Sequence, residues 1–140
     1  MANYSATART NYFRIKERAA FDAWVDTVCY QELSIIEKDG DPLRVGLNAT
    51  SGDCSGFSIN YEDEDGEEQN LLEGLAQHLA EGEVAILVES GAEKCRYVTG
   101  YAIAVMADPA GGYKTLEVSI NDIYGLVEAR WAAKPTEATY

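Results

Sequence analysis

The spacing of apolar residues changes from a period of two to the period of a helix within the first 28 residues, which limits the folds open to this chain. Residues 10–16 alternate apolar and polar side chains, with Tyr12 out of phase, and predict a first strand. From Glu17 onward the apolar positions follow one face of a helix instead. We therefore expect a strand followed directly by a helix whose stripe is Ala20, Phe21, Trp24, Val25 and Val28.

The following residues favour strands joined by a tight turn. Residues 32–38 are expected to be extended, and the turn signal Asp39-Gly-Asp-Pro42 precedes a second strand over 43–47. Residues 56–61 alternate again and predict another strand. The buried side of the hairpin is expected to consist of Ile35, Ile36, Val45 and Leu47.

A second helix is predicted after residue 70. Asn70 is a favourable N-cap, and Glu73 stands three positions later in the capping-box arrangement. The helix is expected to end near Gly82. The apolar run 84–88 that follows is typical of a central strand. The apolar face of the helix is formed by Leu71, Leu72, Leu75 and Leu79.

The C-terminal third predicts two more strands and a third helix. Strands are expected over 96–106 and 114–120, with the turn 108–112 between them. The last helix begins near Ser119 or Asn121. Its apolar residues are Ile123, Leu126, Val127, Ala129 and Trp131.

The order of these elements indicates the fold class. The predicted order is β-α-β-β-β-α-β-β-β-α, with mostly short connections between elements. Runs of strands interrupted by helices indicate an α+β fold with a mostly antiparallel sheet and two or three helices. We expect one domain over residues 1–133 and a flexible C-terminal tail over 134–140.

The charge of the chain is concentrated in one segment. The 140 residues include 24 acidic and 11 basic residues, which give a formal net charge of −13. Direct binding to phosphate backbones is therefore disfavoured. No lysine or arginine stands between Arg44 and Lys94, and those 49 positions hold twelve of the acidic residues. The net charge is thus almost entirely a property of residues 45–93.

The acidic residues of this segment indicate a protein that mimics the phosphates of nucleic acid. Alternate residues on an extended strand lie about 6.6 Å apart, a spacing that resembles that of phosphates along one DNA strand. Carboxylates held at such intervals can occupy the basic groove of a nucleic-acid-binding protein. The alternative left open is that the run only keeps the protein soluble. The expected contact residues are Glu62, Asp63, Glu64, Asp65, Glu67 and Glu68, flanked by Glu73, Glu81 and Glu83.

Catalytic motifs are weak in this sequence. The segment 52–56 has the shape of a nucleophile elbow around Cys54, but the residues after it predict a strand where an elbow needs a helix. His78 is the only histidine, and its place in the pattern is typical of a partly exposed helix residue. We expect no enzyme activity and no cofactor, and a small Cys-dependent enzyme is the third alternative.

A metal site is also weakly indicated. The residues Asp63-x-Asp65-Gly66 resemble the middle of an EF-hand loop. The first and last ligand positions of that loop would be Tyr61 and Leu72, which are not calcium ligands. One histidine and scattered cysteines do not favour a zinc site either, so we expect no metal.

Aromatic residues suggest a different binding surface. Tyr97 and Tyr101 stand four residues apart on one predicted strand and therefore on the same face. With Tyr124 and Trp131 they would form a surface for a protein partner, which is the second alternative. Core packing of these rings is the competing explanation.

Cysteine usage and the lack of targeting signals indicate a compartment. Three cysteines without a C-x-x-C spacing are typical of reduced cytosolic thiols. The N-terminal residues lack the apolar segment of a signal peptide. The longest apolar stretch is far shorter than the ~20 residues of a membrane helix. We therefore expect a cytoplasmic protein without membrane contact, and the oligomeric state is left open.

Four segments resemble those of a known group of proteins. They are TNYFRIKERAAF over 10–21, LAEGEVAIL over 79–87, EKCRYVTGYAIAV over 93–105 and SINDIY over 119–124. The group consists of small acidic proteins from plasmids and integrative elements of bacteria. It carries no catalytic motif, so no functional residue is transferred to this chain.

The resemblance implies a context for the charged segment. Small acidic proteins of mobile elements often resemble anti-defence factors such as anti-CRISPR and antirestriction proteins. Together with the charge, it predicts an inhibitor that blocks a basic nucleic-acid-binding protein, either a CRISPR effector or a restriction enzyme. The second alternative is an accessory protein of a mobile element that binds a protein partner through the aromatic surface named above.

Overall fold

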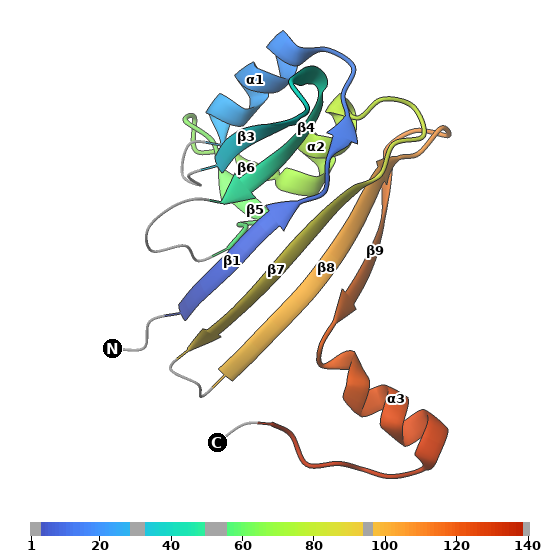
Figure 1. The fold of residues 1–140 in the computed structure, drawn as a ribbon. Coiled ribbons are helices and arrows are strands. Elements are labelled where there is room, and N and C mark those ends of the chain that lie inside the picture. The colour runs from blue at the N-terminus through green and yellow to red at the C-terminus, as the bar shows by residue number, and fades with distance from the viewer. Residues whose placement is uncertain (1–3, 29–32, 50–55, 94–96, 139–140) are drawn as a thin grey trace.

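The computed structural model describes residues 4–28, 33–49, 56–93 and 97–138 of the chain (Figure 1). Its architecture is α+β, with 48% of the residues in strands and 23% in helices, which confirms the predicted fold class. The strands are β1 Tyr4–Thr10, β2 Phe13–Arg14, β3 Leu33–Lys38, β4 Asp41–Ala49, β5 Asn60–Glu62, β6 Glu68–Asn70, β7 Ala85–Glu93, β8 Tyr97–Ala107 and β9 Tyr113–Ser119. The helices are α1 Arg18–Thr27, α2 Leu71–His78 and α3 Asp122–Trp131.

Seven strands form one antiparallel sheet. Its order is β2-β4-β1-β7-β8-β9, and β3 pairs with β4 outside this path. The β3–β4 hairpin turns at Asp39 and Gly40, whose φ angles of 53° and 73° are the left-handed values that a type I′ turn needs. Strands β5 and β6 form a separate two-stranded hairpin.

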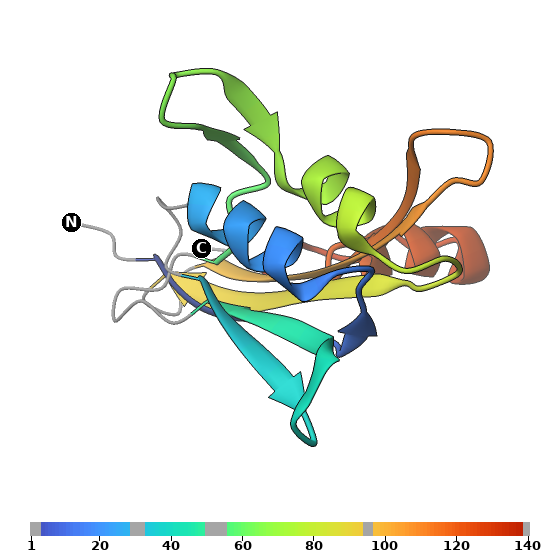
Figure 2. The same ribbon diagram turned by 90° about the horizontal axis from the view of Figure 1, so that it is seen from above.

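Helices α1 and α2 lie on the same side of strands β7 and β8, as the view from above shows (Figure 2). The core fills the space between these helices and the sheet. The helices and the sheet all contribute buried side chains to it. Burial confirms the whole predicted apolar stripe of α2 and most of the predicted stripe of α1. The largest fully buried side chains are Phe13, Phe21, Ile15, Leu47, Leu71, Leu75, Leu79 and Leu87.

Local signals in the sequence explain how α2 begins. The Asn70 side chain accepts hydrogen bonds from the backbone N–H groups of Leu72 and Glu73, at 2.9 and 3.1 Å, and satisfies two donors that the first turn leaves unpaired. This confirms Asn70 as the N-cap. Helix α1 has no such cap, because Glu17 makes no side-chain hydrogen bond to its first turn.

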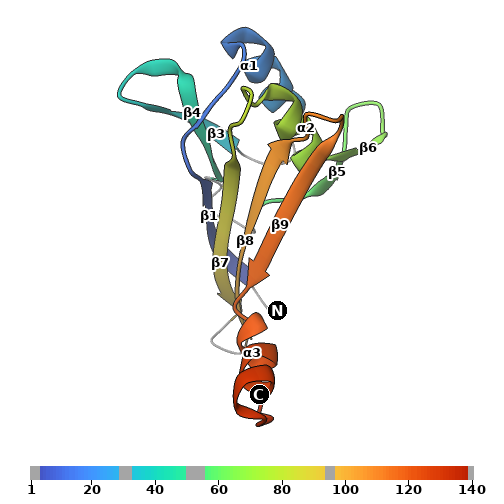
Figure 3. The same cartoon turned by 90° about the vertical axis from the view of Figure 1, so that its right-hand side faces the viewer.

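The C-terminal elements are far less covered than the rest. In Figure 3, α3 lies beyond the end of the sheet, away from α1 and α2. None of the residues of α3 is buried, and β9 exposes nearly all of its residues. None of the described helices combines the length and apolar character that crossing a membrane requires.

The structure adds elements to the predicted order. Strand β1 occupies Tyr4–Thr10 and overlaps the predicted strand 10–16 at Thr10 alone. The rest of that prediction contains only the short β2 and a single bridge at Ile15. Of the predicted strand 56–61, only Asn60 and Tyr61 are extended, as the start of β5. The β5–β6 hairpin contains the acidic run. Ala20 of the predicted α1 stripe is exposed.

Candidate functional site: an acidic hairpin and groove

The acidic run from Glu62 to Glu68 forms the tip of the β5–β6 hairpin. Its register pairs Tyr61 with Gln69, and Glu62 directly with Glu68. The five residues between the paired glutamates form the turn, so only three residues on each side are extended. The expected row of carboxylates at the spacing of a strand is therefore wrong, since the charges cluster around a tight turn.

Asp63 organises this turn. Its Oδ1 accepts hydrogen bonds from the backbone N–H groups of Asp65 and Glu67, both at 2.9 Å, and its Oδ2 accepts one from Nε2 of Gln69 at 3.0 Å. These bonds favour the ionised carboxyl, and the backbone N–H of Glu67 contributes most to a lowered pKa of Asp63. Asp63 thus stabilises the hairpin with both oxygens.

A groove of about 510 Å³ lies between the hairpin and the two helices that cover the sheet. We call it the acidic groove. Tyr61 forms part of its wall, and burial is the main cause of the raised pKa of that phenol. Five carboxylates line the groove and no lysine or arginine does. The lining residues are Trp24, Asp26, Thr27, Tyr61, Asp63, Glu64, Asp65, Gln69, Asn70, Glu73, Gly74 and Gln77.

Trp24 is held firmly in this wall by its neighbours. Its ring centroid lies 5.8 Å from that of Phe21 and 5.3 Å from that of His78. The indole also lies directly on α2 at Gly74, where an added Cβ would stand only 2.5 Å from Nε1. Burial, and then the charge of Lys16, lower the pKa of His78, so this imidazole is neutral at pH 7 and packs as an aromatic ring.

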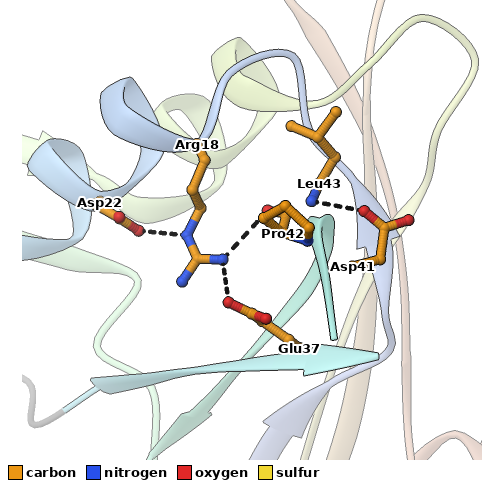
Figure 4. A network of polar contacts seen from close by, with 6 residues as sticks. All are labelled: Arg18, Asp22, Glu37, Asp41, Pro42 and Leu43. Carbon is orange, nitrogen blue, oxygen red and sulfur yellow. Dashed lines mark hydrogen bonds and ion pairs between the residues drawn. The ribbon is translucent and has the colours of Figure 1, made fainter. Parts of the chain in front are cut away.

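Four carboxylates outside the acidic segment, those of Asp22, Glu37, Asp41 and Glu128, have cationic partners. Arg18 donates to Asp22 at 2.7 Å, to Glu37 at 2.6 Å and to the carbonyl of Pro42 at 3.2 Å, and so ties α1 to the β3–β4 hairpin (Figure 4). Among the described residues, the ion pairs join carboxylates outside 45–93 to bases. The charges of the β5–β6 hairpin are left without a cation from the described chain.

The structure brings together some of the predicted contact residues and separates others. Glu73, in the first turn of α2, lines the groove beside the hairpin. Glu81 and Glu83 follow the opposite end of α2 and do not line the groove. Glu83 Oε1 also accepts the backbone N–H of Arg14 at 2.8 Å. The two flanking glutamates therefore do not belong to the same surface as the hairpin.

Glu89 belongs to the acidic segment in sequence but is buried in the structure. It lies on β7, where Oε1 accepts from the backbone N–H of Phe57 at 2.8 Å and from the Tyr101 hydroxyl at 2.9 Å. Its Oε2 accepts from the Tyr4 hydroxyl at 2.9 Å. Burial is the main cause of the raised pKa of Tyr101, and Glu89 adds to it. One of the twelve acidic residues of the segment is therefore a structural group.

The remaining candidates do not form a site within the described residues. Tyr101 packs against the core and donates to Glu89, while Trp131 lies exposed on α3, so these two rings do not share a surface. Cys54 and the side chain of Tyr97 lie outside the described residues. No group of three or more His, Cys, Asp or Glu within the described part of the chain is arranged to hold a metal ion.

The sequence did not predict that Asp26 and Trp24 line the groove. Asp26 contributes a carboxylate from α1, far from the acidic segment in sequence, and Trp24 was assigned only to the apolar stripe of its helix. No local signal marks either one, because the contact of α1 with the hairpin is long-range. Comparison with protein-family models, curated proteins and solved structures gave no match.

Proposed function

We propose that this protein is an inhibitor that binds, through the β5–β6 hairpin and the acidic groove, the basic surface of a nucleic-acid-binding protein. While the inhibitor is bound, the target's basic surface cannot bind nucleic acid. The resemblance to small acidic proteins of mobile elements supports an anti-defence role, with a CRISPR effector or a restriction enzyme as the target. Such a target places the protein in the cytoplasm. The mechanism needs steric and electrostatic block only, without a reaction.

The observation that carries this proposal is the direct pairing of Glu62 with Glu68. Two like charges opposite each other across an antiparallel pair destabilise it. Nothing in the described chain neutralises this pair, although bases are used for neutralisation elsewhere. A basic partner would relieve the repulsion on binding, so part of the affinity would come from strain already present in the free hairpin.

The composition of the groove favours arginine or lysine side chains as its occupants. Carboxylates of Asp26, Glu64 and Glu73 line it together with two aromatic rings. A guanidinium over the face of Trp24 would gain about 0.5–2 kcal/mol from the ring quadrupole. A surface that only keeps a protein soluble needs no such aromatic wall.

Affinity capture from bacteria that carry CRISPR or restriction systems tests this function. The bait variant changes Glu64, Asp65 and Glu67 to lysine and leaves the turn-forming Asp63 intact. We expect the wild-type bait to retain a nucleic-acid-binding protein at low salt and to release it as the salt is raised. The hairpin variant is expected to retain none.

A matched variant distinguishes the effect of the hairpin carboxylates on binding from the effect of net charge. It changes the exposed residues Glu17, Glu81 and Glu117 to lysine, and so has the same net charge as the hairpin variant. It should capture the partner nearly as well as wild type. Equal loss in both variants, or full capture by the hairpin variant, would reject the proposed function.

A further inference from the structure

One face of the three-stranded unit β7–β8–β9 is apolar and bare. The register sets the side chains of even-numbered residues on the face opposite α1 and α2. Val118 and Leu116 on β9 are 62% and 78% exposed there, and Val88 and Val98 on the neighbouring strands are exposed as well. Eight of the eleven large apolar side chains exposed among the described residues lie on this face or on α3, and two more, Val84 and Ile120, stand directly before β7 and after β9.

Among the described residues, β7, β8 and β9 place no carboxylate on this face. The acidic residues of the three strands, Glu89, Glu93 and Glu117, are all odd-numbered and face the other side. Lys114 is the only charged residue that the three strands place on the apolar face. In a chain of net charge −13, a face without any acidic residue can approach another copy without repulsion between carboxylates.

Helix α3 also leaves its apolar side chains uncovered. The C-terminal segment contacts it through polar groups, where Lys134 lies 3.9 Å from Glu128 and the backbone N–H of Ala138 donates to the Tyr124 hydroxyl at 2.8 Å. It has ten residues, none of them buried, and Gly125 lies in its interior. A free helix shorter than about 12–15 residues is marginal in water, and an interior glycine weakens it further. Ile123 and Leu126 are exposed on this helix, and Trp131 is 76% exposed. The helix therefore needs an apolar surface against which to pack.

The accessible surface of the whole chain is larger than that of a compact monomer, and the apolar face and α3 are part of this excess. The chain exposes 8975 Å² at a mass of 15.3 kDa. A compact monomer of that mass exposes about 7,100 Å², so the excess is roughly 1,800 Å². A stable protein–protein interface removes about 800 Å² from each partner. The excess is large enough for an obligate dimer interface.

We propose that a second copy of this chain covers the apolar face. In a two-fold dimer, α3 of each copy would pack on β7–β9 of the other, so both uncovered apolar elements are buried in one isologous contact. The acidic groove is lined by residues of α1, α2 and the β5–β6 hairpin. Figure 2 shows α1 and α2 on one side of the sheet, and the apolar face is on the other. Such a dimer would keep its acidic grooves on the outside, and its existence does not depend on the proposed function.

Light scattering coupled to size exclusion, on the full 140-residue chain at micromolar concentration, tests this dimer. We expect twice the mass of 15.3 kDa for wild type. Leu116→Asp and, independently, Leu126→Asp should reduce the mass to that of one chain. Both side chains are exposed in the single chain, so neither substitution disturbs its core.

Thr115→Asp is the matched control, because Thr115 is exposed on the same strand but faces the other side. It should remain dimeric. A monomeric wild type would overturn the proposal, whether α3 is bare or folded onto its own sheet. An assembly larger than a dimer, dimers that persist in both aspartate variants, or dissociation by Thr115→Asp would also overturn it.

Discussion

Replacing Glu62 by lysine is expected to stabilise the folded protein while it weakens partner binding. The substitution converts the direct Glu62–Glu68 pair from repulsion to attraction without removing any described contact of the core. The reciprocal change, Glu68→Lys, should act in the same direction. Changing both residues restores a like-charge pair, now positive, so the gain from the pair disappears.

The magnitude follows from the geometry of an antiparallel pair. Charges directly opposite each other lie about 6 Å apart, which gives a repulsion of about 0.7 kcal/mol in water. A Debye length of about 10 Å at 0.1 M salt reduces this to roughly 0.4 kcal/mol. Each single variant therefore gains about 0.8 kcal/mol from the pair. The double variant should fall short of additivity by about 1.6 kcal/mol.

Chemical unfolding of the four proteins in the cycle measures these differences. In a thermal melt, each single variant should gain about 2–3 °C. At 1 M salt, where the Debye length is about 3 Å, the coupling should nearly vanish. Glu81→Lys is the control, because it makes the same charge change at an exposed residue that has no paired glutamate in the hairpin register.

An additive double variant at low salt would refute this reasoning, because the two glutamates would then not face each other. A coupling that is unchanged at 1 M salt would refute the electrostatic cause. A gain by Glu81→Lys equal to that of Glu62→Lys would assign the effect to the net charge of −13 instead.

Three further substitutions test the packing behind the site. Glu89→Ala should cost about 3 kcal/mol of unfolding free energy, because buried donors, among them the N–H of Phe57, lose their acceptor; urea unfolding measures it. Burial lowers the pKa of His78 in the folded protein below 6.5, so the neutral imidazole contributes its full share of the unfolding free energy above pH 6.5, and this contribution falls as the pH drops toward the folded-state pKa. Unfolding curves of His78→Gln measured across this pH range should lack this pH dependence. Gly74→Ala should displace Trp24, with a net loss of about 1 kcal/mol after the gain in helix propensity; tryptophan fluorescence and denaturation follow it.

Local signals were sufficient for much of the fold. The N-cap and apolar stripe of α2 follow from its own residues, as does the turn at Asp39 and Gly40. The alternation of residues 4–10 was missed, because its buried positions hold only Ala6, Ala8 and Thr10 instead of the large apolar side chains that mark a strand. Small residues suffice there, since β1 is covered on one face by the core.

The site was only half predictable, for a physical reason. The acidic run is visible in the sequence, but its turn depends on hydrogen bonds to Asp63, and its wall depends on Trp24 from a distant helix. Charge counting also cannot distinguish a solvated carboxylate from a buried one such as Glu89. Those distinctions arise from long-range packing, which has no signature in a single segment.

Competition for the captured partner tests the central claim most directly. The partner's affinity for its own nucleic acid is measured while the wild-type protein or the Glu64, Asp65 and Glu67 lysine variant is added. Wild type should displace the nucleic acid, less effectively at higher salt, and the variant should not. A stable ternary complex, in which wild type binds the partner and leaves its nucleic acid in place, would contradict the account.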